Sequence, residues 1–327
     1  MPEDLIRMAI PNLTRIPFTR VEMPVKGHPI VFLHTRSLGS SFAPLDTSFV
    51  AKPEEWGAFE RSPAAAKQVF AKSIEAMASL FAATTSHFPE FRSLDDREVA
   101  LVRARAPEDK RDTLPVEKNT WVVMSFVHSL KDLAGLAAKG GSTARSVFSY
   151  IMKTPRVMRE LGRILVVDLF NGSGDRFFVR DARRVAGVQN LGNLFVVSPD
   201  GLFLTCEFCG IDFWDPSSEY KDLYVPIGPG WNGDLLHDGK KAELERMAKA
   251  IVTQLPAKIA EAAKGGHAAD EDDEGPAPRV VLGSPHAKEF VTGTREGKAA
   301  LKAHLQRLIR TGGVPSGVVS RMRALAW

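Results

Sequence analysis

The stretch of residues 164–215 constrains the fold more than any other part of the chain. It starts as the apolar end of a helix, passes through a loop that contains Gly-Asp-Arg, and then places two β-rich runs on either side of Pro199-Asp200-Gly201. Pro-Asp-Gly between β-rich runs is typical of a turn that joins two antiparallel strands. We therefore expect the loop before the first strand to lie beside the loop after the second.

Three polar side chains mark these loops: Asp175, Asn193 and Asp212. In phosphoryl transfer, one carboxylate orients the attacking hydroxyl group, while an Asn and a second carboxylate hold Mg²⁺ on the nucleotide phosphates. We expect Asp175 to be the positioning group or base, and Asn193 and Asp212 to be the metal ligands. Each residue alone is more typical of a turn or a helix cap, so the hypothesis depends on their order around the two strands.

The same order resembles the catalytic block of protein kinases, and three motifs make the resemblance more specific. Gly-x-x-Asp-Arg at residues 172–176, Asn-x-x-Asn at residues 190–193 and Ile-Asp-Phe at residues 211–213 are similar to the actin-fragmin kinase and phosphatidylinositol 4-kinase branch of the protein-kinase-like superfamily. That branch uses Asp-Arg where ordinary protein kinases have His-Arg-Asp. The resemblance implies ATP and Mg²⁺ as cofactors and a structural role for Arg176.

The chain departs from this family pattern at three points. Ser173 stands where the family usually has Asn, and Phe177 stands where it often has His. The gap that follows Asp175 is long, which leaves both Asn190 and Asn193 as candidates for the metal ligand. We prefer Asn193 because it adjoins the apolar strand.

A phosphate-binding loop is predicted nearer the N-terminus. Two β-rich runs, residues 28–35 and 47–52, enclose a connection that contains Gly39, Ser40 and Ser41. Small residues at a hairpin tip let backbone N–H groups approach phosphates, although the same residues also form ordinary turns. Gly-Ser-Ser before a strand that ends in Lys-Pro is similar to the phosphatidylinositol 4-kinase-like families.

Lys52 ends that strand, and the resemblance implies that its ammonium group binds the α- and β-phosphates. A carboxylate from the next helix would fix the ammonium group. That helix is predicted over residues 62–81 from a Ser-Pro start and apolar residues at helical spacing. Glu75 is the only acid in its body, so we assign Glu75 to Lys52; the alternative is an exposed Glu that pairs with Lys72 or Lys67.

Residues 121–127 form a short apolar β-rich run. In a kinase-like chain this run becomes the hinge whose backbone groups pair with adenine. Backbone recognition leaves little side-chain signal, so Ser125 and Val127 are assigned to the nucleotide by position alone, and a buried strand without ligand contact would look the same. Residues 99–104 are a further expected strand.

The C-terminal half is predicted to be mainly helical. Helical periodicity covers residues 130–138 and 143–170, and a long helix interrupted by a proline covers residues 243–263. Residues 265–278 combine small residues with an acidic run and are typical of a flexible insertion. A final amphipathic helix at residues 295–310 carries basic residues that could meet an acidic partner or a lipid headgroup; a solvated face is the alternative.

Composition excludes several classes of protein. The formal charge of +4 gives no sign of the concentrated basic face of a nucleic-acid binder, so no nucleic acid is expected. Cys206 and Cys209 lack the second ligand pair of a zinc site, and we interpret them as buried cysteines. The first residues lack the apolar core of a secretory signal, and no run has the length of a transmembrane segment. We expect a cytoplasmic location, with delivery into another cell by a dedicated secretion system left open.

Together these features predict an α+β protein with the two-lobed protein-kinase-like fold. Residues 1–127 would form a small antiparallel β N-lobe that begins with an extended arm, and residues 128–327 a mainly helical C-lobe with the catalytic hairpin. The predicted reaction transfers the γ-phosphoryl group of ATP to a hydroxyl acceptor, most readily Ser or Thr of a protein. The alternatives are a phosphoinositide or small-molecule kinase, a catalytically dead kinase-like binding module, and a protein AMP-transferase.

Overall fold

The computed structural model divides the protein into two compact units, Met1–Ala78 with Pro89–Phe126 and Ser79–Phe88 with Val127–Trp327. The first holds an antiparallel sheet and the second is mostly helical, so the α+β class is confirmed. The kinase-like arrangement of two lobes stays a prediction. The structure describes residues 10–23, 29–36, 46–55, 63–86, 90–115, 119–125, 130–174, 176–180, 185–198, 201–210, 231–265, 279–311 and 316–327.

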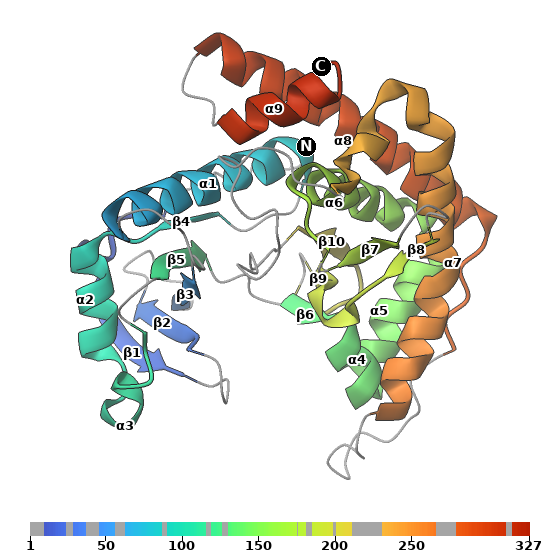
Figure 1. The fold of residues 1–327 in the computed structure, drawn as a ribbon. Coiled ribbons are helices and arrows are strands. Elements are labelled where there is room, and N and C mark those ends of the chain that lie inside the picture. The colour runs from blue at the N-terminus through green and yellow to red at the C-terminus, as the bar shows by residue number, and fades with distance from the viewer. Residues whose placement is uncertain are drawn as a thin grey trace, which may run out of the picture. The chain divides into compact units, whose positions relative to one another are not determined.

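A five-stranded antiparallel sheet in the order β1-β2-β3-β5-β4 forms the first unit (Figure 1). Buried Val31 and Leu33 alternate with more exposed neighbours along β2, as expected of a strand with one face in the core. The two expected β-rich runs around the Gly-Ser-Ser connection form strands, as do residues 121–125 of the third run, whose last two residues lie outside the described part of the chain. The strands are β1 (Phe18–Glu22), β2 (Val31–Arg36), β3 (Asp46–Glu55), β4 (Phe91–Ser93) and β5 (Asn119–Ser125).

The buried carboxylate of Glu98 shows that the N-terminal segment is more than the expected extended arm. Glu98 accepts hydrogen bonds from the Arg92 guanidinium at 2.6 and 2.8 Å and from the Leu13 N–H at 2.7 Å. Leu13 is fully buried, so the N-terminal segment is part of the core and contributes β1, not only an extended arm. Burial alone would raise the pKa of Glu98, but these hydrogen bonds lower it overall.

The expected strand at residues 99–104 is wrong, because this segment lies in the helix α2 (Asp96–Arg105). The Asp95 side chain accepts from the Glu98 N–H, and the Glu98 side chain accepts from the Asp95 N–H. This reciprocal pair is a capping box, which starts a helix firmly. A short helix, α3 (Glu108–Arg111), follows.

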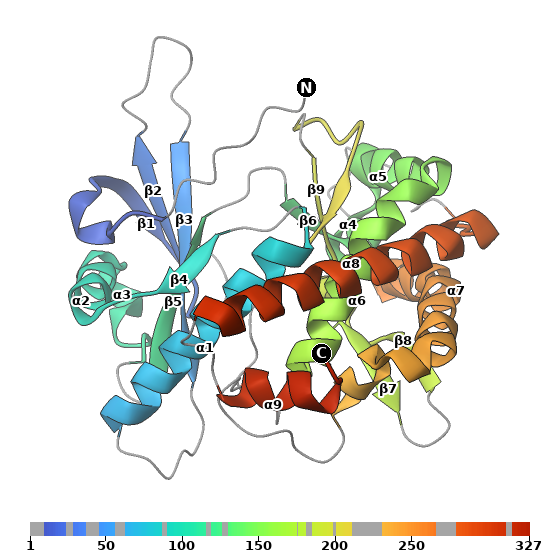
Figure 2. The ribbon, with the colours of Figure 1, turned by 90° about the horizontal axis from the view of Figure 1, so that it is seen from above.

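Helix α1 (Pro63–Thr84) confirms the predicted helix and extends it by one turn. In the second unit, α4 lies beside α7, and α6 packs against α8 (Figures 1 and 2). The long helix α7 continues through Pro256 without the expected interruption, and α9 follows the helix that we expected to be the last. The helices are α4 (Leu133–Lys139), α5 (Gly141–Lys153), α6 (Met158–Asn171), α7 (Lys241–Gly265), α8 (Ser284–Thr311) and α9 (Ser316–Ala324).

Glycines set the distance between α6 and α8. A Cβ atom added at Gly162 would overlap the carbonyl oxygen of Phe290, and one added at Gly293 would overlap the carbonyl of Arg159. A Cβ atom at Gly297 would lie 2.9 Å from the Cα atom of Arg163. The two helices therefore meet through backbone atoms, which only glycine permits at these positions.

Replacing Gly293 by Ala should destabilise the second unit. The new methyl group has backbone as its neighbour, which cannot rotate away, so we expect the free energy of unfolding to fall by about 1–3 kcal/mol. Gly265→Ala is the matched control, since a Cβ atom there meets nothing within 4 Å. Urea unfolding of both variants tests this, and equal stabilities would contradict the close packing.

Candidate functional site

The end of α6 and the loop that follows it fold back on one residue, Asp168. Gly172 adopts a left-handed conformation with φ 80°, which ends the helix. The backbone then turns so that the Ser173 N–H donates to the Asp168 carbonyl at 2.9 Å and the Gly172 N–H donates to the Leu169 carbonyl at 3.3 Å. These two bonds form a Schellman motif, which requires the glycine found in the Gly-x-x-Asp-Arg sequence.

The Asp168 side chain holds the far end of the same loop. Its carboxylate accepts two hydrogen bonds from Arg176, at 2.8 Å from Nε and 2.5 Å from Nη2, and both residues are only 1% exposed. The guanidinium carbon lies 5.6 Å from the centre of the Phe81 ring, and the Arg176 carbonyl accepts from the Gln189 N–H at 2.8 Å. This buried ion pair agrees with the structural role that the resemblance implies for Arg176.

Asp175 falls between these two anchors but lies outside the described residues. Its two neighbours in the chain differ in solvent exposure: Gly174 is exposed and Arg176 is buried. The loop therefore enters from solvent at Gly174 and returns to the core at the next described residue. Asp168 therefore contacts the described residues on both sides of Asp175, Ser173 through its backbone and Arg176 through its side chain.

The predicted hairpin is present as two antiparallel strands of a three-stranded sheet, in the order β10-β9-β6. Cys209 pairs with Phe195, two residues after Asn193, and both Cys206 and Cys209 are buried as expected. The second strand is shorter than the β-rich run suggested, because residues 202–205 are irregular. The strands are β6 (Leu130–Asp132), β9 (Phe195–Val197) and β10 (Glu207–Cys209), and the separate pair β7 (Phe177–Arg180) and β8 (Val185–Val188) precedes them.

The two candidate metal-binding Asn residues lie in different settings. Asn190 is exposed, and its Oδ1 atom accepts from the Gly192 N–H at 2.9 Å, which caps the short 3-10 helix Leu191–Asn193. Asn193 is half-buried and ends that helix next to β9. The carboxamide of Asn190 is thus engaged in local structure, whereas Asn193 occupies the position beside the strand.

The remaining candidate residues divide between the described and undescribed parts of the chain. In the first unit, Lys52 is half-buried on β3, opposite Val122 of β5. Glu75 is exposed on α1, and its Oε1 atom accepts a hydrogen bond from Ser93 Oγ at 3.5 Å. The predicted contact between Lys52 and Glu75 stays a prediction. The candidates outside the described residues are Gly39, Ser40, Ser41, Val127, Asp175 and Asp212.

Ser125, the other residue assigned to the nucleotide, makes its backbone contacts within the first unit. Its N–H donates to the Glu90 carbonyl at 3.0 Å. Its hydroxyl group donates to the same carbonyl at 3.4 Å. An adenine contact from Ser125 would consequently have to use its own carbonyl oxygen.

Asn171 is a polar residue of this region that the sequence did not single out. It is the last residue of α6, it is 6% exposed, and within the described part of the chain neither its Oδ1 nor its Nδ2 atom has a hydrogen-bond partner. A buried carboxamide without partners is costly and rare. In the sequence an Asn before Gly looks like an ordinary helix end, so only its burial reveals it.

Asn171→Leu should therefore stabilise the protein. Removing an unsatisfied buried carboxamide is expected to raise the free energy of unfolding by about 1–3 kcal/mol. Gln254→Leu is the opposite case, because Gln254 Nε2 donates to the Ala186 carbonyl at 2.8 Å, and this variant should lose stability. If Asn171→Leu is destabilised instead, Asn171 has a binding partner in solution.

A serine and a histidine that lie in contact do not form a catalytic pair. Ser79 Oγ lies 2.6 Å from His304 Nε2, and Arg307 Nη2 lies 3.1 Å from His304 Nδ1. A guanidinium group can only donate, so Nδ1 must accept and Nε2 carries the proton. Burial and the charge of Arg307 lower the pKa of His304. The imidazole thus donates to Ser79 and cannot take its proton.

The described residues contain no group of three or more His, Cys, Asp or Glu side chains that could hold a metal ion. Asp175 and Asp212 lie outside the described residues, so the metal site stays a prediction. None of the described helices combines the length and apolar composition needed to cross a membrane. No protein-family model and no curated protein sequence matches this chain.

Proposed function

We propose that this protein is an ATP-dependent kinase that transfers the γ-phosphoryl group to a hydroxyl acceptor, with Ser or Thr of a protein as the first choice. The observation that carries the proposal is the double anchoring of the Gly-x-x-Asp-Arg loop on Asp168. A group that positions an acceptor must itself be held in place, because phosphoryl transfer depends on alignment more than on covalent chemistry by the enzyme. The loop that carries Asp175 has such a support.

In the proposed reaction, the acceptor oxygen forms a bond to the γ-phosphorus while the bond from that phosphorus to the β–γ bridging oxygen breaks. Asp175 orients the acceptor hydroxyl group and takes its proton, and ADP leaves with the bridging oxygen. Lys52 pairs with the α- and β-phosphates, and Glu75 fixes its ammonium group. The Gly39-Ser40-Ser41 connection contributes backbone N–H groups to the phosphates, and Ser125 and Val127 contact adenine.

The donor set suits Mg²⁺, which prefers oxygen ligands and keeps several waters. Asn193 and Asp212 would hold the ion, and a bound Mg²⁺ would neutralise charge on the nucleotide phosphates. The engagement of Asn190 as a helix cap supports Asn193 as the ligand. The antiparallel register supports Asn193 and Asp212 as two ligands of one ion, because β10, which precedes Asp212 in the chain, ends opposite the residues that follow Asn193.

A phosphoinositide or small-molecule kinase would use the same groups and is the second candidate. Basic residues on α8 favour it, because an acidic partner or a lipid headgroup could be recruited there. We propose a cytoplasmic location with either acceptor.

Labelled nucleotide distinguishes these reactions. The protein is incubated with Mg²⁺ and ATP labelled on either the α- or the γ-phosphate, alone, with a mixture of protein acceptors, or with phosphoinositide vesicles. Label transferred only from the γ-position supports the kinase, and its appearance in protein or in lipid identifies the acceptor class. Transfer of the α-label would show an AMP-transferase, and nucleotide binding without transfer would show a catalytically dead module.

A further inference from the structure

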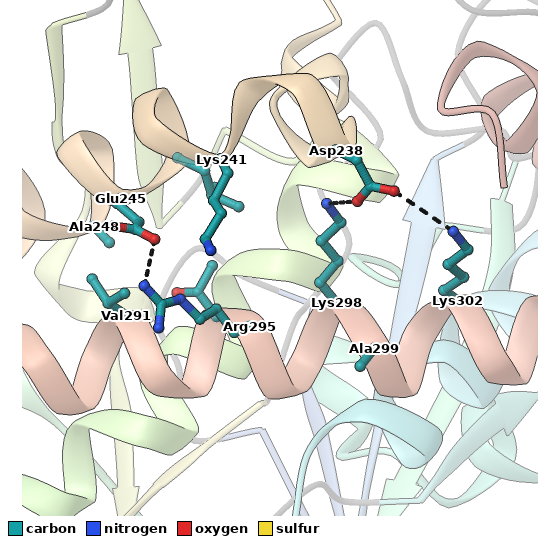
Figure 3. A pocket seen from close by; sticks show the side chains of 11 residues that line it. Asp238, Lys241, Glu245, Ala248, Val291, Arg295, Lys298, Ala299 and Lys302 are labelled. Atoms are coloured by element: carbon teal, nitrogen blue, oxygen red, sulfur yellow. Dashed lines mark hydrogen bonds and ion pairs between the residues drawn. The ribbon is translucent and has the colours of Figure 1, made fainter.

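A cavity of about 300 Å³ lies between α7 and α8 in the second unit, and its lining includes none of the residues assigned to phosphoryl transfer (Figure 3). Its volume is at the lower end of the range found for small-molecule sites. Four cationic and two anionic side chains line it, which leaves a net charge of +2. The cations are Lys241, Arg295, Lys298 and Lys302, and the anions are Asp238 and Glu245.

The floor of the cavity is apolar. Leu244 and Ala248 of α7 are buried, and Val291 of α8 is buried opposite them. Ala299 adds an exposed methyl group to the lining. An apolar floor below a charged rim fits a ligand that has an apolar body and an acidic group at one end.

Two of the four cations, Lys298 and Lys302, lie at one side of the cavity beside Asp238. Its carboxylate accepts a hydrogen bond from Lys298 at 2.5 Å and lies 3.8 Å from Lys302 (Figure 3). The Asp238 side chain is 72% exposed, and ion pairs so open to solvent contribute little to stability. An incoming acid could therefore replace this carboxylate between the two lysines at low cost.

Neighbouring cations lower the pKa values of both carboxylates in the cavity. The pKa of Asp238 is lowered, first by the hydrogen bond from Lys298 and then by the charges of Lys298, Lys302 and His237. The pKa of Glu245 is lowered by Arg295, with further contributions from Lys241 and Lys249. An environment that favours these two anions also favours a bound one.

A second ion pair, between Glu245 and Arg295, lies at the other end of the cavity from Asp238. Glu245 accepts from Arg295 Nη2 at 2.5 Å, and this pair stands between the first cavity and a second one of about 620 Å³ that shares both residues. Lys241 points from α7 toward α8 between the two ion pairs (Figure 3). A small molecule fits the volume of about 300 Å³ between the two ion pairs better than an extended peptide does.

We propose that the cavity between α7 and α8 binds a small organic anion with an apolar body and one phosphate or carboxylate group, which displaces Asp238 from Lys298 and Lys302. This site is independent of the proposed phosphoryl transfer. Carboxylates and phosphomonoesters share the chemistry that two lysines recognise. The apolar floor distinguishes such a ligand from an inorganic ion.

Equilibrium dialysis with 1-naphthyl phosphate tests the proposal, because the probe combines an aromatic body with a phosphate. Lys298→Gln/Lys302→Gln should weaken binding by about tenfold or more, since charge-assisted hydrogen bonds are lost. Lys139→Gln/Lys153→Gln removes the same charge from exposed positions on α4 and α5 and should leave binding unchanged. Inorganic phosphate and 1-naphthol, which each lack one half of the probe, should compete only weakly.

Asp238→Asn provides a test that poor folding cannot imitate, because it should strengthen binding. Removing the competing carboxylate is expected to raise the affinity about threefold or more at low salt. Glu261→Gln is the matched control, an exposed α7 carboxylate that pairs with Lys258 at 3.0 Å, and it should have no effect.

Two results would overturn the proposal. One is equal binding of the probe by wild type and Lys298→Gln/Lys302→Gln. The other is binding of anionic lipid vesicles, but not of 1-naphthyl phosphate, that depends on Lys298 and Lys302, since the basic face would then serve a membrane surface.

Discussion

Asp175→Asn is expected to lower the rate of ATP-dependent phosphoryl transfer by about 10²–10⁴-fold, the usual contribution of a positioned acid or base. The carboxamide keeps the size of the side chain but cannot take the acceptor proton. Nucleotide affinity should change little, because Asp175 faces the acceptor in the proposed reaction. The measurement is the initial rate of γ-label transfer at saturating ATP and Mg²⁺, together with nucleotide binding by calorimetry.

Two comparisons make this result specific. Lys52→Ala should weaken nucleotide binding as well as turnover, because its ammonium group is assigned to the phosphates. Glu261→Gln changes an exposed carboxylate on α7 and should match wild type in both measurements. If wild type and Asp175→Asn transfer phosphate at the same rate, the catalytic assignment is wrong. If neither transfers phosphate but both bind ATP, the protein is a binding module.

Breaking the Asp168–Arg176 pair is expected to have the largest effect on stability. Either Asp168→Leu or Arg176→Met leaves one buried charge without its partner, which typically costs about 3–5 kcal/mol. Both side chains are almost fully buried, so water cannot compensate for the lost partner. Urea unfolding followed by circular dichroism measures the change in the free energy of unfolding.

The double variant Asp168→Leu/Arg176→Met distinguishes the contribution of the ion pair from the cost of leaving one buried charge unpaired. It removes both charges, so we expect it to be more stable than either single variant, as found when buried ion pairs are replaced by apolar residues. Glu261→Gln, which breaks an exposed pair with Lys258, should change the stability by less than about 1 kcal/mol. Single variants as stable as wild type would show that the pair does not form.

The loop also links these two predictions. In the double variant the fold should persist, but the loop loses its side-chain ion pair while its backbone hydrogen bonds, such as that from the Ser173 N–H to the Asp168 carbonyl, can remain. We therefore expect phosphoryl transfer to fall even where stability recovers. Activity that follows stability in all three variants would mean that the ion pair supports the fold alone.

Much of the secondary structure follows from local residue preference and spacing. β-rich composition predicted β2, β3 and β5, and apolar residues at helical spacing predicted α1 and α6. The strand expected at residues 99–104 failed because apolar content outweighed a capping signal that was visible as Asp95 and Glu98. The N-terminal segment was taken for an arm because its prolines suggest a break, whereas its burial depends on a distant carboxylate.

The candidate site could be predicted only in part from the sequence. A structural role for Arg176 was expected from the family resemblance, and the structure shows its buried ion pair with Asp168. The preference for Asn193 over Asn190 came from its position beside the apolar strand and stays a prediction, whereas the capping hydrogen bond of Asn190 is visible only in the structure. Asn171 and the cavity between α7 and α8 arise from tertiary packing of segments far apart in the chain, so no local signal marks them.

The glycines of α6 and α8 restrict how this protein can be altered. Because Gly162, Gly293 and Gly297 bring the two helices together through backbone atoms, no layer of side chains between them can repack. One helix forms a wall of the cavity at Lys298, and the other ends at the loop that leads to Asp175. Evolution or engineering therefore has to adjust these two regions together, since neither helix can shift alone.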